Sequence, residues 1–178
     1  MTLFETAPYQ NIILTGAMGV GKTTIGRAVA RRLKVEMYDL ENEIMTREGQ
    51  SADEIRELFG EARLKALETE ALRDLTLRRQ SVVVISGPAM LNEANRDRLV
   101  ESGPILCLTC TLNEILRRMY VARGAWFHNP ANRGVLLSRL KREMRVAELD
   151  VQKLDTSELS IEDTTTAVIE FWLSHAQV

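Results

Sequence analysis

The chain has 178 residues, a formal net charge of −2 at pH 7 and two cysteines. The length fits one domain over residues 1–178, and the charge argues against a nucleic-acid partner. Two cysteines are too few for a disulfide framework, and no apolar run reaches membrane-spanning length. The first ten residues lack the layout of a signal peptide, so we expect a cytoplasmic protein.

Short apolar runs alternate with longer amphipathic stretches along the chain. The pattern predicts strands at residues 11–15, 36–40, 82–86, 105–109 and 151–155. The runs at 82–86 and 105–109 are apolar nearly throughout, which is typical of strands covered on both faces. Strands that alternate with helices predict a parallel sheet with helices on both of its faces.

Three helices are predicted to begin with a capping box, at Ser51, Thr111 and Ser160, because an acidic residue follows each of them at the third position. Residues 61–79 repeat apolar side chains at helical spacing. The segment 122–134 has polar residues, a proline, two glycines and no clean period. It is therefore predicted to be a loop.

The stretch GAMGVGKTT, residues 16–24, follows the first predicted strand and precedes a predicted helix. Gly16, Gly21, Lys22 and Thr23 match the phosphate-binding pattern G-x-x-x-x-G-K-[ST]. Its glycines let successive N–H groups point into one concavity, to which the helix start adds positive charge. The lysine can reach the β- and γ-phosphates, and the threonine hydroxyl can bind Mg²⁺. The alternative is a glycine-rich turn that binds nothing.

Two carboxylates, Asp39 and Glu41, stand at the end of the second predicted strand. Ligands of open parallel sheets bind beyond the carboxyl ends of the strands. One carboxylate there can hold Mg²⁺, and the other can orient an attacking hydroxyl or accept its proton. Equally, both can be solvated residues at a helix start, where acidic side chains are favoured.

With these residues in place, the chain resembles the shikimate kinases, small P-loop enzymes that move the γ-phosphate of ATP to the 3-hydroxyl of shikimate. The resemblance runs over nearly the whole chain and is most specific in GAMGVGKTTIGRAVARRL, YDLENEI and GQSADEIRELFGEARLKALETEAL. It implies a three-layer α/β/α sandwich with a five-stranded parallel sheet in the order 2-3-1-4-5. It also implies a lid at about 122–134 and a role in aromatic amino acid biosynthesis.

The resemblance also implies the nucleotide site, with ATP and Mg²⁺ as cofactors. Lys22 and the loop amides hold the phosphates, Thr23 and Asp39 serve the metal, and Arg118 flanks the adenine. The implied nucleotide-binding residues are Gly16, Ala17, Met18, Gly19, Val20, Gly21, Lys22, Thr23, Thr24 and Arg118.

On the acceptor side, Glu41 takes the place of an aspartate that contacts substrate hydroxyls. Lys65 takes the place of an arginine that pairs with the substrate carboxylate, and Arg142 matches a second such arginine. Gly87 lies where the family has a triple glycine at the substrate. Arg123 matches the lid arginine that reaches the transferring phosphate, and Arg133 is a second candidate for that role.

The implied catalytic residues are Lys22, Glu41 and Arg123, of which Glu41 orients the acceptor hydroxyl. The departures from the family pattern gather on the acceptor side: Glu41 and Lys65, together with Ser86 and Pro88 in the triple-glycine segment. A lysine loses the bidentate geometry of an arginine, and a proline lacks a backbone N–H. Because the charge signs at Glu41, Lys65 and Arg142 are retained, the acceptor is expected to be a small hydroxylated anion, shikimate or a relative of it.

Two alternatives stay open at this point. One is another small P-loop kinase that acts on a sugar acid or a nucleotide, and the other is a nucleotide-binding regulatory protein without catalysis. The pair Cys107 and Cys110 has the spacing of a redox or zinc motif but no second ligand pair, so it is interpreted as core-filling. The chain is expected to act as a monomer, without a membrane partner.

Overall fold

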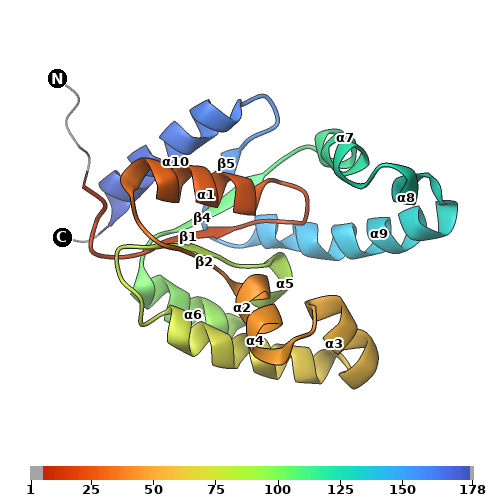
Figure 1. The fold of residues 1–178 in the computed structure, drawn as a ribbon. Coiled ribbons are helices and arrows are strands. Elements are labelled where there is room, and N and C mark those ends of the chain that lie inside the picture. The colour runs from red at the N-terminus through yellow and green to blue at the C-terminus, as the bar shows by residue number, and fades with distance from the viewer. Residues whose placement is uncertain (1–5, 177–178) are drawn as a thin grey trace.

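The computed structural model describes residues 6–176, and its centre is a parallel five-stranded sheet in the order β2-β3-β1-β4-β5 (Figure 1). This confirms the predicted fold class and strand order. Each predicted strand is present, with ends shifted by two residues at most. The strands are β1 Ile12–Thr15, β2 Met37–Asp39, β3 Val82–Val84, β4 Ile105–Thr109 and β5 Gln152–Asp155.

Helices cover both faces of the sheet, as Figure 1 shows, with α1 and α10 on one side and α2, α4 and α6 on the other. A 3₁₀-helix, η1, leads into the last strand. The helical elements are α1 Lys22–Leu33, α2 Leu40–Glu48, α3 Ala52–Phe59, α4 Glu61–Leu75, α5 Gly87–Met90, α6 Glu93–Ser102, α7 Leu112–Arg123, α8 Ala125–His128, α9 Pro130–Glu143, η1 Met144–Glu148 and α10 Ile161–His175.

Two hydrophobic cores lie on opposite faces of the sheet, because successive strand side chains point in opposite directions. Ile12 and Leu14 belong to the core that includes Trp172 of α10, whereas Ile13 belongs to the core under α2, α4 and α6. All three strand residues are completely buried. The central strand is therefore covered on both faces, as its apolar run predicts.

Local signals in the sequence place the helix starts correctly. Ser51 and Glu54 form a reciprocal capping box, in which the Ser51 hydroxyl accepts from Glu54 N–H at 3.2 Å and the Glu54 carboxylate accepts from Ser51 N–H at 2.7 Å. Thr111 and Ser160 also accept from the amide three residues on. The predicted helix at 61–79 ends at Leu75, four residues early.

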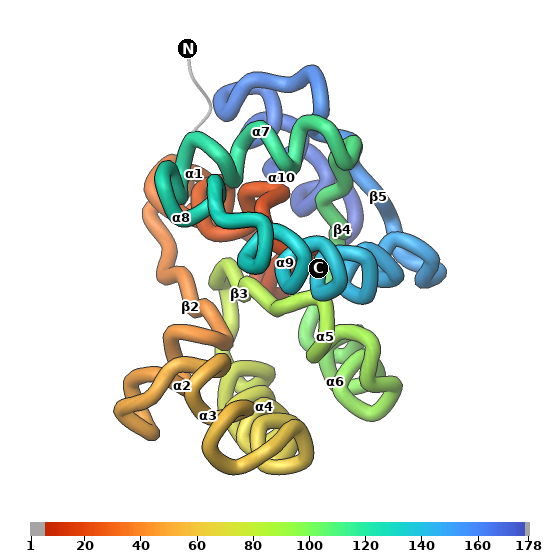
Figure 2. Tube along the Cα trace, turned by 90° about the vertical axis from the view of Figure 1, so that its right-hand side faces the viewer, coloured from red at the N-terminus to blue at the C-terminus, as the bar shows by residue number. Residues whose placement is uncertain are grey.

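The segment 122–134 is helical, so the prediction of a loop is wrong there. It contains the end of α7, the short helix α8 and the start of α9. Asn129 caps α9, since its Oδ1 accepts from Ala131 N–H at 3.0 Å. Pro130 takes the first helical position, where no backbone N–H is needed. Figure 2 looks onto this side of the molecule, where α7, α8 and α9 lie in front of the sheet.

A buried asparagine joins the amino ends of the central strands. The Asn11 amide donates to Arg78 O at 2.7 Å and to Ser102 Oγ at 2.8 Å. Its oxygen accepts from the backbone N–H and the hydroxyl of Ser81, at 3.1 and 2.7 Å. Every polar atom of this side chain is thus satisfied, as burial requires.

Cys107 and Cys110 are buried free thiols. Within residues 6–176 no group of three or more potential ligands is arranged to hold a metal ion. Cys110 belongs to one hydrophobic core and Cys107 to the other, as their interpretation as core-filling residues expects. None of the helices in this part of the chain combines the length and apolar character that crossing a bilayer requires.

Candidate active site

The predicted phosphate loop connects β1 to α1. Gly16 and Gly21 have φ angles of 144° and 100°, in the region that favours glycine. A Cβ atom on Gly16 would lie only 2.4 Å from the backbone oxygen of Leu108. The helix begins directly after the loop, at Lys22, so its free N–H groups face the loop's concavity. The conformation of the loop therefore requires glycine at positions 16 and 21.

Lys22 folds back over this loop. Its Nζ donates to the backbone oxygens of Gly16 and Ala17, each at 2.9 Å. Burial lowers the pKa of the Lys22 ammonium, although the nearby charges of Glu143 and Glu41 partly oppose that shift. The negative charge of a phosphate group at this position would also favour the charged ammonium, as the two carboxylates do.

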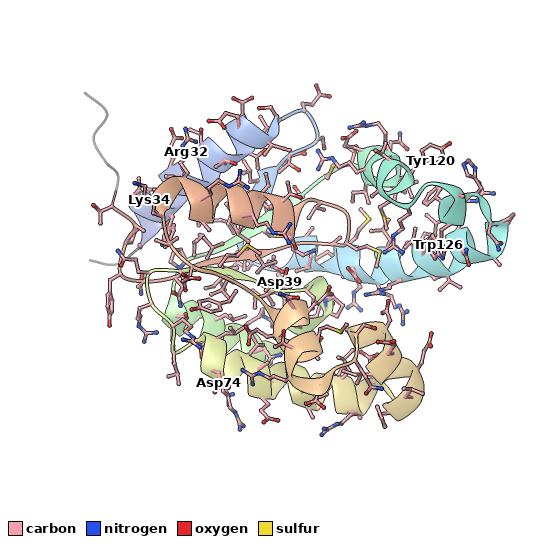
Figure 3. The ribbon with its side chains drawn as sticks, viewed as in Figure 1. Arg32, Lys34, Asp39, Asp74, Tyr120 and Trp126 are labelled. Atoms are coloured by element: carbon pink, nitrogen blue, oxygen red, sulfur yellow. The ribbon has the colours of Figure 1, made fainter. Side chains whose placement is uncertain are left out.

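Thr23 and Asp39 meet at the carboxyl end of β2. The Thr23 hydroxyl donates to Asp39 Oδ2 at 2.8 Å. The other oxygen of Asp39 accepts from the backbone N–H of Glu41 at 3.1 Å, so Asp39 also caps α2. One oxygen therefore serves the helix start, as the alternative interpretation expects, and the other contacts Thr23 beside the phosphate loop. The metal-binding role of Asp39 stays a prediction. Figure 3 shows Asp39 near the middle of the molecule, between the two helical layers.

Two adjoining cavities open at this edge of the sheet. The larger, of about 940 Å³, is lined by the phosphate loop and by residues of α7 and the loop after β5. The smaller, of about 540 Å³, lies between α1, α2 and α3. Ligands that occupied both cavities would meet at the residues that line each of them, which are Thr23, Asp39, Glu41, Asp53 and Arg139.

Glu41 faces both cavities from the first turn of α2. Glu41 is exposed by surface area, but the protein around it desolvates its carboxyl in part, and this raises the pKa of Glu41. The Lys22 ammonium acts in the opposite direction without cancelling the shift. A carboxylate whose pKa is raised is a better proton acceptor than an ordinary one.

Arg139, which sequence reasoning missed, lines both cavities from helix α9. Its Nη1 donates to the two oxygens of Asp53 at 2.7 and 2.9 Å, and its Nε donates to Glu143 Oε1 at 3.0 Å. Glu143 Oε2 in turn accepts from the Met18 N–H of the phosphate loop at 2.8 Å. A chain of hydrogen bonds therefore runs from α3 through α9 to the phosphate loop.

A signal for this arrangement was present in the sequence. The run RLKREMR at 139–145 is basic, and Arg142 is its only member for which a role was predicted. Leu136, Leu140 and Glu143 are all buried, and their helical spacing defines the inward face of α9. Arg139 lies on that face, three residues after Leu136 and four before Glu143.

The structure does not bring two of the predicted acceptor residues to the cavities. Lys65 and Arg142 are exposed, and neither lines either cavity. Gly87 is buried, and a Cβ atom there would lie 3.3 Å from the backbone oxygens of both Gly16 and Glu143. Close packing of the chain against the phosphate loop therefore explains a glycine at this position.

The two departures from the family pattern beside Gly87, Ser86 and Pro88, both fit the start of a helix. Ser86 lines the larger cavity and caps α5, where its hydroxyl accepts from Ala89 N–H at 3.3 Å. Pro88 lies in the first turn of that helix, where its missing N–H removes no helical hydrogen bond.

Two arginines were predicted around the nucleotide, Arg118 and a lid arginine for which Arg123 was favoured over Arg133. Arg118 and Arg123 line the larger cavity. Arg118 is fixed by hydrogen bonds to Val20 O at 3.1 Å and to Thr156 O at 2.9 Å. Arg123 lies over the ring of Trp126, 4.9 Å from its centroid, and also lines the cavity. Arg133 is exposed and lines neither cavity. The lid role of Arg123 stays a prediction.

Comparison with known proteins agrees with this geometry. The family described as shikimate kinase matches residues 18–172. The shikimate kinase of Geobacter sulfurreducens is 38% identical over 93% of this chain and 92% of its own, and that of Geobacter metallireducens is 32% identical over 94% of each chain. The structure of shikimate kinase from Acinetobacter baumannii in complex with shikimate has a TM-score of 0.78 and 31% identity, over 96% of both chains. The chain belongs to the shikimate kinase family.

Proposed function

We propose that this protein phosphorylates shikimate, transferring the γ-phosphoryl group of ATP to the 3-hydroxyl. The observation that carries the proposal is that the cavity of the phosphate loop adjoins a second cavity at Thr23, Asp39 and Glu41. A phosphoryl donor and a hydroxyl acceptor placed in these cavities would meet at that boundary. The family of the chain and the shikimate complex of a structural relative support the same acceptor.

The residues present fit ATP and Mg²⁺. The concave loop supplies backbone N–H groups, and Lys22 supplies a cation that the surrounding protein has partly desolvated. Thr23 Oγ1 and Asp39 Oδ2 form an adjacent pair of oxygen ligands of the kind that Mg²⁺ prefers. Mg²⁺ held by these two residues would neutralise charge on the phosphates.

On the acceptor side, Glu41 orients the attacking hydroxyl and accepts its proton, since its carboxylate faces both cavities and its pKa is raised. Arg139 binds the acceptor carboxylate in place of Arg142, which lies outside the cavities. Its planar guanidinium offers the paired donors that a carboxylate accepts.

Charge that develops on the transferred group is met by Lys22 and by Arg123. Arg123 comes from the end of α7, next to the connection that leads into α8. The segment 122–134 moves as a helical lid that excludes water during transfer. All the residues invoked belong to one chain, so the proposal requires only a monomer.

A coupled ATPase assay with purified protein tests the proposal against its two alternatives. Shikimate, gluconate and a nucleoside monophosphate serve as acceptors, each with Mg²⁺ and ATP. If shikimate is the only one of the three acceptors that is phosphorylated, the proposal is supported. If only another acceptor is phosphorylated, the protein is a different small-molecule kinase. If no acceptor is phosphorylated while calorimetry detects Mg²⁺–ATP binding, the protein is a nucleotide-binding regulator.

A further inference from the structure

The guanidinium of Arg139 is shared between two carboxylates that differ in their exposure to solvent. Nη1 donates to both oxygens of Asp53, at 2.7 and 2.9 Å, and Nε donates to Glu143 Oε1 at 3.0 Å. The side chain of Asp53 is 58% exposed, whereas that of Glu143 is 5% exposed. Arg139 therefore forms one solvent-exposed ion pair, with Asp53, and one buried ion pair, with Glu143.

A guanidinium binds a carboxylate best through two parallel N–H donors. It has two edges that present such a pair, one made by Nη1 and Nη2 and the other by Nε and Nη2. In Arg139, Asp53 engages one donor of the first edge and Glu143 engages one donor of the second. A carboxylate of a ligand can thus form a two-bond pair only after one of them releases its donor.

Of the two carboxylates, Asp53 releases Arg139 more readily. Glu143 is buried and its other oxygen holds the Met18 N–H in place, so release of Arg139 would leave a buried charge without its cationic partner. Asp53 faces solvent and keeps a second partner, because Arg56 Nη1 donates to its Oδ1 at 2.7 Å. Partial burial acts to raise the pKa of Asp53, but Arg139 and Arg56 outweigh it and hold the pKa below its usual value. Asp53 is therefore ionised at neutral pH, as a competitor must be.

We propose that Asp53 is a specificity-determining residue of the acceptor site, which competes with the carboxylate of the acceptor for Arg139. The inference rests on the proposed function, because it takes the acceptor to carry a carboxylate. Binding of the acceptor exchanges one ion pair for another at the same guanidinium. Arg139 therefore contributes less net affinity than an unpaired arginine would, and the site discriminates only weakly between the acid and an uncharged analogue.

The test compares the wild type with Asp53→Asn and Asp53→Ala, using shikimate and its neutral carboxamide as acceptors. Glu57→Gln is the matched control, because it removes an exposed carboxylate one turn further along α3, outside both cavities. With either Asp53 variant we expect the KM and the calorimetric Kd for shikimate to fall about two- to fivefold, the range of an exposed ion pair. The kcat, the KM for ATP and the KM for the carboxamide should stay within twofold, and Glu57→Gln should match the wild type.

The inference is overturned if the Asp53 variants bind shikimate no better than the wild type. It is also overturned if their affinities for the acid and for the carboxamide rise equally. A weaker affinity would instead make Asp53 a direct contact of the acceptor. Failure of the proposed function has a different signature, namely no phosphorylation of shikimate by the wild type. The calorimetric Kd values still decide in that case, since tighter binding to Asp53→Asn supports the inference, and no binding to either protein overturns it.

Discussion

Glu143 Oε2 accepts a 2.8 Å hydrogen bond from the backbone N–H of Met18, although 125 residues separate the two in sequence. The contact joins the last turn of α9 to the phosphate loop. The other carboxylate oxygen accepts from Arg139, which faces the acceptor side. One buried side chain thus fixes the loop that holds the donor and the arginine that faces the acceptor.

Replacing Glu143 should therefore destabilise the fold. Glu143→Ala leaves the Met18 N–H without its acceptor and opens a small cavity, which we expect to lower the free energy of unfolding by about 2 kcal/mol. Glu143→Gln keeps an oxygen that can accept from the Met18 N–H, so the free energy of unfolding should fall by only about 1 kcal/mol. Urea denaturation measures both. Glu148→Ala, at an exposed position in η1, is the control, and a Glu143→Ala protein as stable as that control would contradict the prediction.

Lys22→Ala should abolish most of the activity without unfolding the protein. The ammonium contacts the predicted phosphate loop, and removing one preorganised group of this kind costs about 100-fold or more in turnover. Only two hydrogen bonds to loop carbonyls are lost with it. Steady-state kinetics and thermal melting measure the two effects, with the exposed Lys141→Ala on α9 as control. Turnover within tenfold of the wild type would show that Lys22 does not hold phosphate.

The elements that sequence reasoning predicted well are those fixed by local rules. The phosphate loop is specified by backbone conformation at Gly16 and Gly21, which only glycine adopts without strain. Buried strands such as Ile12–Thr15 are specified by their continuous apolar runs. Signals of this kind depend on a few neighbouring residues, and tertiary contacts do not change their meaning.

The predictions that failed have two causes, which are a local signal that was misinterpreted and features whose meaning depends on distant residues. Pro130 and the polar residues around it indicated a loop, yet Asn129 turns the proline into a helix start. Arg139 is functional because Asp53, 86 positions away, comes to lie opposite it. The buried network of Asn11 likewise joins residues 67 to 91 positions apart. Such partners are set by the topology of the sheet, which a local pattern does not reveal.

The two candidates for the lid arginine make a matched pair for testing which one meets the transferred group. Arg123 lines the larger cavity, whereas Arg133 is exposed and lines neither. We expect Arg123→Ala to lower kcat by about 100-fold or more, because its charge serves mainly the transition state. The Kd for Mg²⁺–ATP should change by less than about threefold, and Arg133→Ala should behave like the wild type. The reverse result, normal turnover for Arg123→Ala and a slow Arg133→Ala, would exchange their roles.

Glu68 should make the stability of the protein depend on pH. Burial, reinforced by the charge of Glu61, raises the pKa of Glu68 to about 7 in the folded chain from 4.5. The folded state then binds more protons than the unfolded state between these values, so stability is full below pH 4.5 and falls until about pH 7, by roughly 3 kcal/mol. Glu68→Gln should remove this slope and gain stability over the wild type at pH 8. Urea denaturation at pH 5 to 8 measures the difference, with the exposed Glu70→Gln on the same helix as control. Parallel pH profiles for the wild type and Glu68→Gln would mean that the carboxyl is ionised throughout and that solvent or a cation stabilises its charge in the folded protein.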